Sequence, residues 1–136
     1  MELARFSLIN YHFDKVSMDL RNLSAKSSFN IEFEPSGVFD KDKSQYLLTF
    51  KFTAKDDGTG REVVSVNCVA LYMFKGVNSI EEIPAFFFNN AIAILFPYIR
   101  AFVSTVTLQA NIKPILLPTL NLSDLQDRLK ENTRNV

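Results

Sequence analysis

Hydrophobic and polar residues alternate over much of residues 1–75 with the period of two that is typical of β-strands. Apolar side chains recur from Ile9 to Phe13 and again from Val16 to Leu20, but the parity changes between the two runs. Because successive strand residues face opposite sides of a sheet, the change predicts one bent strand with a bulge near residue 14.

A short second strand is predicted where Phe29, Ile31 and Phe33 alternate with Asn and Glu. Pro35 and the residues after it are expected to end this strand, because proline lacks the N–H that a sheet requires. The polar stretch before it, residues 21–28, has no period and is expected to be a crossover loop.

The third and fourth strands form a predicted hairpin. Every even position from Tyr46 to Ala54 is apolar, and the DDGTG motif at residues 56–60 follows as a turn of Asp and Gly. The Val-rich return strand, residues 62–75, has one apolar and one mixed face, so it is expected at the centre of the sheet.

The chain from Ile83 to Leu122 is almost uncharged, with only Arg100 and Lys113 carrying charge. It predicts either one helix from about Ile83 or a short segment followed by a main helix from about residue 90, with a kink at Pro97. This helix is apolar over so much of its girth that burial on more than one side is expected. We therefore predict an oligomer interface at six of its residues: Ile92, Phe96, Ile99, Phe102, Val103 and Val106.

Pro114 and Pro118 prevent the next segment from continuing as helix, so it is expected to be extended and to expose leucines. Ser123 and Gln126 fit a capping box that begins a short final helix. The narrow apolar face of that helix consists of Leu122, Leu125 and Leu129.

Composition narrows the class of protein. The chain has 136 residues, 47% of them hydrophobic, and a formal net charge of zero, which predicts a single domain over residues 1–136 and leaves nucleic acid without a basic surface. One cysteine and the absence of a signal-peptide pattern predict a reducing cytoplasm. Burial between protein layers accounts for the apolar helix better than a membrane span, because Arg100 would be costly in lipid.

Candidate catalytic chemistry is sparse. His12 is the only histidine and Cys68, on the apolar face of a strand, is expected to be a buried, inert thiol. One Cys and one His cannot close a zinc site, and no phosphate-binding Gly loop is present. The sequence therefore predicts no enzyme, no metal and no cofactor.

Two motifs carry a resemblance to a known family. The helix motif ILFPYIR at residues 94–100, and LPTLNL at residues 117–122 leading into a short helix, resemble the C-terminal half of the bacterial protein-export chaperone SecB. The order of strands fits as well. The resemblance implies an α+β fold in which one face of a four-stranded antiparallel sheet carries a long and a short helix. It also implies a homotetramer with the long helices between two composite sheets.

The resemblance further implies a cytoplasmic, ATP-independent holdase for unfolded preproteins and other non-native polypeptides. Apolar burial is non-directional, so an apolar groove would bind exposed hydrophobic segments of many sequences. The alternative is that the same side chains form the hydrophobic core of the chain itself. The client-binding positions carried over are Phe29, Ile31, Phe33, Leu116, Leu117, Leu120, Leu122, Leu125 and Leu129.

The chain also departs from the family. Export SecB proteins use carboxylates on the sheet to dock the ATPase SecA, whereas Ser65 and Asn67 stand at that place here, and the C-terminus RLKENTRNV is not acidic. This chain thus lacks the acidic residues through which the resemblance would imply SecA docking. The alternatives are a SecB-like chaperone of an antitoxin or other dedicated client, and an interaction domain for one folded partner.

Overall fold

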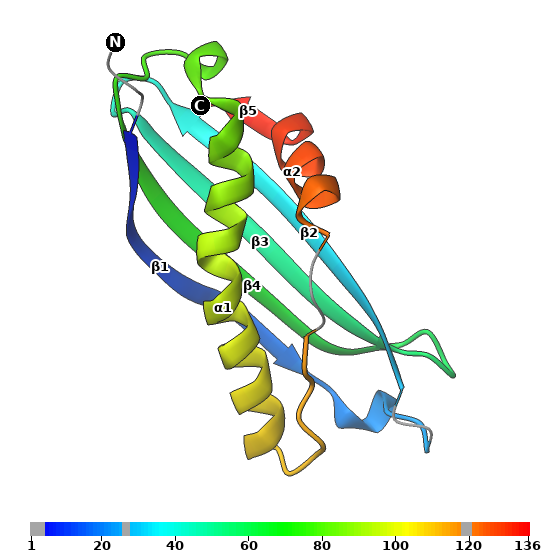
Figure 1. Ribbon diagram of the computed structural model, residues 1–136. Helices are drawn as coiled ribbons and strands as arrows, with labels where there is room; N and C mark the ends of the chain where they lie inside the picture. Colours follow the sequence, from blue (N-terminus) through cyan, green and yellow to red (C-terminus); the bar gives the residue numbers. More distant parts are fainter. Residues whose placement is uncertain (1–4, 26–27, 118–120) are drawn as a thin grey trace.

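The computed structural model describes residues 5–25, 28–117 and 121–136 as one sheet with both helices on one face (Figure 1). The strand order is β1-β4-β3-β2-β5, antiparallel except for β5, which runs parallel to β2. The strands are β1 (Arg5–Met18), β2 (Phe29–Asp40), β3 (Gln45–Asp56), β4 (Glu62–Lys75) and β5 (Thr133–Asn135). The helices are α1 (Ala85–Gln109) and α2 (Leu122–Glu131), with two short 3-10 turns, η1 (Leu20–Asn22) and η2 (Ile80–Glu82).

The fold class expected from the sequence is confirmed, with a correction to the number of strands. The sheet has five strands, not four, because Thr133–Asn135 adds a short strand beside β2. Three residues are too few to give a periodic pattern, so hydropathy could not reveal this strand.

The break predicted in the first strand is confirmed. The pairing of β1 with β4 shifts between Phe13 and Lys15, which returns the apolar side chains to the helix-facing side. A second shift, between Leu8 and Asn10, was not predicted. The fourth strand lies between β1 and β3, as its apolar face and its mixed face predicted.

β2 is longer than predicted and continues through Pro35 to Asp40. Pro35 is tolerated because it lies at an edge of the sheet. β2 pairs with β3 on one side, and on the other side β5 pairs only from Gly37 onward. Gly37 lies under the ring of Tyr46, and a Cβ at this position would overlap the Tyr46 hydroxyl. The glycine is therefore required by a close contact between strands.

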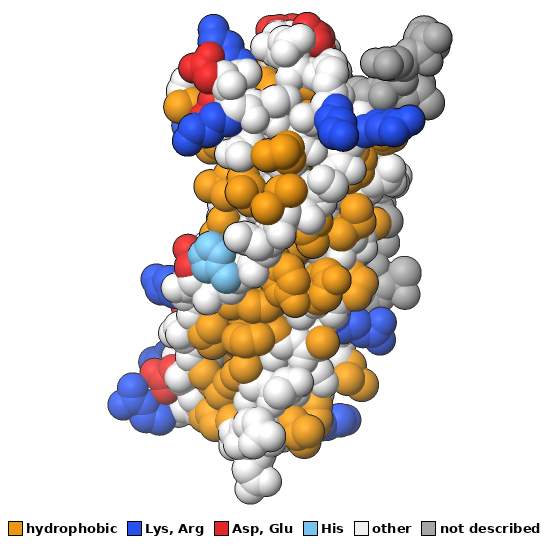
Figure 2. All heavy atoms as spheres, turned by 90° about the vertical axis from the view of Figure 1, so that its left-hand side faces the viewer, with side chains coloured by type: hydrophobic (Ala, Val, Ile, Leu, Met, Phe, Trp, Pro, Cys, Tyr) orange, Lys and Arg blue, Asp and Glu red, His pale blue; other side chains and the backbone are white. Residues whose placement is uncertain are grey.

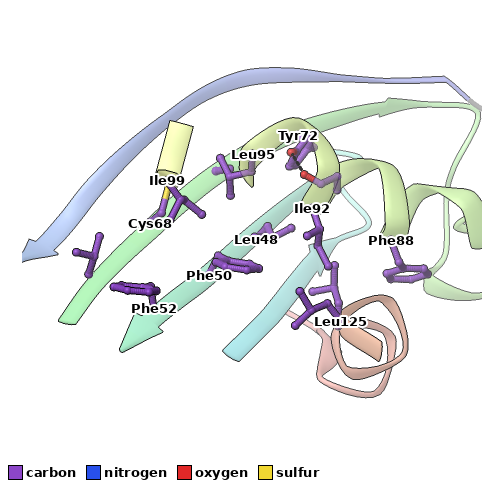
Figure 3. Close-up of a cluster of buried hydrophobic side chains, with 14 of the residues drawn as sticks. Leu48, Phe50, Phe52, Cys68, Tyr72, Phe88, Ile92, Leu95, Ile99 and Leu125 are labelled. Carbon is purple, nitrogen blue, oxygen red and sulfur yellow. Dashed lines mark hydrogen bonds between the residues drawn. The ribbon is translucent and has the colours of Figure 1, made fainter. Parts of the chain in front are cut away.

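α1 is one continuous helix through Pro97, which supports the first of the two sequence interpretations. Its inner side packs on the even residues of β3 and β4, among them Leu48, Phe50 and Cys68 (Figure 3). The buried Tyr72 hydroxyl donates to the Ala91 carbonyl at 2.7 Å and ties the helix to the sheet. By length and composition α1 could also cross a membrane, as core helices of soluble folds can, but eight of its residues are buried here.

Candidate functional site

A cavity of about 540 Å³ opens between the crossover loop, the start of β2 and the segment after α1. We call it the crossover groove. Among the described residues, its lining is apolar except for Lys113 and consists of Leu23, Phe29, Ile31, Ile112, Lys113, Pro114, Ile115 and Leu116. The volume lies within the range of natural ligand sites and admits several apolar side chains.

Thr107, buried in the last turns of α1, fixes one wall of the groove. Its hydroxyl donates to the Val103 carbonyl (2.9 Å) and accepts the backbone N–H of Ile115 at 3.0 Å. Ile115 and Leu117 turn inward and are buried, whereas Leu116 between them is 70% exposed. The segment is thus anchored at alternate residues and presents Leu116 to solvent.

Asp56 fixes the opposite wall. Its carboxylate accepts from the N–H and the hydroxyl of Ser24 (3.0 and 2.8 Å) and from the N–H and the hydroxyl of Thr59. The backbone hydrogen bond from Ser24 is the main cause that holds the pKa of Asp56 below its ordinary value. The carboxylate thereby ties the crossover loop, and Leu23 with it, to the hairpin turn.

The predicted client-binding residues fall into distinct places. Phe29, Ile31 and Leu116 line the crossover groove. Phe33 is half-buried on the same face and packs against Phe96, with ring centroids 6.2 Å apart.

The other predicted client-binding residues are not among the described lining of the groove. Leu117, Leu125 and Leu129 are buried in the core of the single chain. Leu120 and the side chain of Leu122 lie outside the part of the chain that the structure describes. The described lining of the crossover groove thus comes from residue 23, the start of β2 and residues 112–116, and not from Leu125 or Leu129 of α2.

Sequence reasoning missed several lining residues. Ile112, Lys113 and Pro114 belong to the proline-punctuated run already recognised as exposed, so their position beside Leu116 was a usable signal. Leu23 stands alone in a polar loop, and Thr107 is a single polar residue in an apolar helix. Neither has a pattern that marks it.

The predicted interface residues of α1 mostly face the chain's own sheet. Ile92, Ile99 and Val103 are buried there, and Phe102 stacks on Phe13 with centroids 4.0 Å apart. Phe96 and Val106 are half-buried. The stripe chosen from the sequence was thus the inner one, because hydropathy alone does not say which side of an all-apolar helix meets its own sheet.

A different apolar surface remains open on α1 and β1. Figure 2 shows hydrophobic side chains running along the β1 side of the molecule, near His12. Tyr11 of β1 stacks on Tyr98 of α1, with centroids 4.3 Å apart, and joins the two elements into one surface. We call this surface the β1–α1 face; its exposed apolar residues are Ile9, Tyr11, Val16, Phe86, Ile94, Tyr98 and Leu108.

The two side chains considered for catalysis, His12 and Cys68, lie on opposite faces of the sheet. Burial raises the pKa of the Cys68 thiol to about 12, with the nearby Asp14 charge as a smaller cause. Cys68 pairs with Phe13 in the sheet, and His12 therefore points to the opposite face. Among the residues that the structure describes, no group of three or more potential ligands could hold a metal ion.

The helix-free face of the sheet carries Ser65 and Asn67 at the place where the resemblance to export SecB proteins implied carboxylates. Asn67 donates to the Asp14 carboxylate at 2.7 Å. Lys15, Lys51 and Ser65 surround it in a hollow of about 240 Å³. The local charge is therefore mixed rather than acidic.

Residues 14–132 match the protein family described as Preprotein translocase subunit SecB. A protein-export protein SecB of Magnetococcus marinus is 32% identical over 128 residues, which cover 83% of this chain and 81% of that protein. An uncharacterised protein of Methanocaldococcus jannaschii is 26% identical over 123 residues, which cover 88% of this chain and 79% of that protein.

Two solved structures share the fold. The SecB-like chaperone Rv1957 of Mycobacterium tuberculosis, in complex with a ChAD peptide from the antitoxin HigA1, has a TM-score of 0.67 at 19% identity, with 86% of this chain and 91% of that chain covered. A protein of unknown function from Streptococcus agalactiae has a TM-score of 0.51 at 14% identity, with 87% of this chain and 100% of that chain covered.

Proposed function

The chain belongs to the SecB family, and from this premise we propose that it is an ATP-independent holdase that binds non-native polypeptides in the crossover groove. The observation that carries the proposal is an apolar, solvent-open cavity at which Leu116 is 70% exposed. A leucine that gains nothing from the chain's own core is free to contribute to a bound partner.

The groove would select clients by exposed hydrophobic surface. Apolar burial yields roughly 25 cal/mol per Å² and is non-directional, so the groove would have only a weak sequence preference. Folded proteins bury their hydrophobic segments and would therefore not bind. No nucleotide is required in this scheme, because binding and release are both reversible steps of an apolar contact.

The β1–α1 face supports a homo-oligomer, for which the tetramer of the family is the proposed form. An apolar surface of this extent on a small chain is usually covered by a partner. Several grooves on one oligomer would then bind one long client at separate points, and avidity would exceed the affinity of a single groove by orders of magnitude.

The test of the holdase proposal is aggregation of unrelated proteins. Chemically unfolded substrates of different sequence, diluted into buffer without ATP, should stay soluble in the presence of this protein. A matched variant, Leu116→Ser, should be less effective while its oligomer and melting temperature stay near those of the unsubstituted protein, since Leu116 contributes little to folding. Equal aggregation with and without the protein would refute the proposal.

The fold of the antitoxin-bound chaperone favours one alternative, a SecB-like protein dedicated to a single client such as an antitoxin. The same aggregation experiment separates the two, because a dedicated chaperone would protect one partner and leave unrelated substrates unprotected. A domain that uses the β1–α1 face for one folded partner would instead bind that partner in its native state.

Docking to SecA in a bacterial cytoplasm, and thus a role in translocation, is the part of the family's function with least support here. Asn67 and the lysines near it offer a mixed surface rather than a carboxylate cluster. Binding of purified SecA to this protein, measured at low salt, tests that role directly.

A further inference from the structure

The helix-free face of the sheet carries a second apolar surface, which the proposed function does not use. Figure 1 shows both helices on the same side of the sheet, so neither of them covers the opposite side. On that side β4 changes character along its length: Ser65 and Asn67 are polar, whereas Val69, Leu71 and Met73 are apolar. The mixed face predicted for this strand is thus polar at one end and apolar at the other.

The neighbouring strands extend the apolar end into a patch. The register pairs Val38 of β2 with Leu47 of β3, and Leu47 with Leu71 of β4, so these three side chains form one row across the sheet. Val38, Leu47 and Met73 are exposed, and Val69 and Leu71 are half-buried. We call these five residues the outer patch. Apolar residues that are exposed singly are ordinary on a protein surface, but a contiguous group marks an interaction site.

The dimensions of the outer patch fit one α-helix. The row of Val38, Leu47 and Leu71 spans two strand spacings of ~4.8 Å, which makes it about 10 Å wide, close to the diameter of a helix. Along β4 the patch runs from Val69 to Met73, about 13 Å, which matches between two and three helical turns. A helix with apolar residues at positions i, i+4 and i+7 would cover it, whereas a standard interface between folded domains is considerably larger.

The charged rim of the outer patch is mainly basic. Lys75 lies two residues beyond Met73 on the same face of β4, and it pairs with Arg5 of β1. Arg134 of β5 pairs with Val38 and extends the central row at its other side. None of these three cations forms an ion pair with a residue that the structure describes.

Two carboxylates of β2 stand on the same face of the sheet. Asp40 already accepts the backbone N–H groups of Asp42 (3.1 Å) and Lys43 (3.3 Å) in the turn after β2. Glu34 lies farther along the strand and pairs with Lys51, whose charge opposes its own. A partner that reaches the patch therefore meets cations that have no counter-ion of their own, and it gains most if it supplies carboxylates.

We propose that the outer patch docks an amphipathic helix of a partner protein, with acidic residues beside its apolar stripe. The stripe covers the row centred on Leu47, and the carboxylates reach Arg5, Lys75 and Arg134. This inference goes beyond the proposed function, because the patch lies on the face of the sheet opposite the crossover groove. It also differs from the SecA docking that the resemblance implied, which requires carboxylates on the sheet, since cations select the opposite charge.

The first measurement compares two fluorescent helical peptides. They share one stripe of leucines and differ only in the residues that flank it, which are glutamate in one peptide and lysine in the other. At low salt the unsubstituted protein should bind the acidic peptide about 10-fold more tightly or better, and the difference should shrink at high salt. Equal affinities, a preference for the basic peptide, or no binding of the acidic peptide would overturn the inference.

The second measurement locates the bound peptide. Leu47→Asp and Leu47→Lys lose the same apolar contact but introduce opposite charges at the centre of the outer patch, and both should fold because Leu47 is exposed. The acidic peptide should bind roughly 10-fold more tightly to Leu47→Lys than to Leu47→Asp. Leu116→Ser, which alters only the crossover groove, should bind it as the unsubstituted protein does.

Two outcomes would show that the patch is not a separate site. Equal affinity of the two Leu47 variants, together with weaker binding by Leu116→Ser, would assign the peptide to the crossover groove and overturn the inference. Suppression of aggregation should be unchanged in Leu47→Asp, and its loss there would also overturn the inference. Because the holdase proposal is tested at Leu116, failure at Leu47 leaves that proposal standing.

Discussion

At the scale of single residues, the polar side chains of Thr107 and Asp56 hold the walls of the groove in place, although neither belongs to a hydrophobic pattern. Thr107 and Asp56 sit on opposite walls and each ties a loop to a regular element. Sequence reasoning interpreted Asp56 only as a turn former and passed over Thr107. Hydropathy reports where side chains are buried, but it does not report which backbone N–H a buried oxygen accepts.

Thr107→Val should loosen the wall of the groove. Valine has nearly the same shape but leaves the buried N–H of Ile115 without an acceptor, which costs about 1 to 3 kcal/mol. A denaturant melt should show this loss, and peptide affinity should fall with it. Thr107→Ser keeps the oxygen and should retain affinity, although the lost methyl group lowers stability somewhat. If Val and Ser bind peptide equally, the hydrogen bond does not hold the loop.

Asp56 should make stability depend on pH in acid. Because its pKa in the folded protein is below that of the unfolded chain, the stabilisation is complete above the unfolded value of about 3.9 and is lost as pH falls through the folded pKa. Thermal melts from neutral pH to about pH 3 should therefore decline less steeply for Asp56→Asn, which has no charge to lose. Parallel declines for both proteins would contradict this assignment.

At the scale of elements, periodicity predicted what the chain forms better than where each element ends. The bulge in β1 followed from a change of parity, but β2 continued past Pro35, whose place at an edge no local pattern shows. The N-cap of α2 is Asn121, two residues before the Ser123 that the capping box implied, because the Asn121 side chain accepts the N–H of Asp124. Several residues near a helix start can act as its N-cap, and which of them does so depends on the direction from which the preceding loop enters the helix.

The outer side of α1 should control assembly. Ile94→Asp places a charge on the β1–α1 face, where the side chain is 39% exposed in the single chain, so folding should be little affected while an interface would be disrupted. Leu47→Asp is the matched control, because Leu47 is 41% exposed on the helix-free face. Light scattering should show a smaller particle for Ile94→Asp alone. A stable monomer of the unsubstituted protein would remove the basis of the prediction.

At the scale of the whole molecule, the sequence led to the family and to the fold, whereas the client site that it suggested stays a prediction. Leu125 and Leu129 were assigned to client binding by resemblance, and the structure places both in the core. The distinction depends on how α2 lies across β2, which is a tertiary fact. Phe29, Ile31 and Leu116 were predicted from a strand and a proline-rich loop, both of which are local patterns, and the structure brings all three to one groove.

The charge of Lys113 at the groove should bias the choice of client. Among the described residues that line it, only Lys113 is charged, so a peptide with aspartate beside its apolar segment should bind more tightly than the same peptide with lysine there. The difference should shrink at high salt and reverse in Lys113→Glu. Paired titrations of the two peptides measure it. Equal affinities at low salt would show that Lys113 extends into solvent and takes no part.

The buried Cys68 makes the rate of thiol modification a measure of how often the folded chain opens. A thiol reagent attacks the thiolate, and a fully enclosed sulfur with a pKa near 12 offers almost none at neutral pH. Modification must wait until the centre of the sheet opens, so its rate reports how often the folded chain unfolds rather than how its surface behaves. A second cysteine placed at Leu116 would react at once, and the protein would carry a fast probe of the groove and a slow probe of the core in the same molecule.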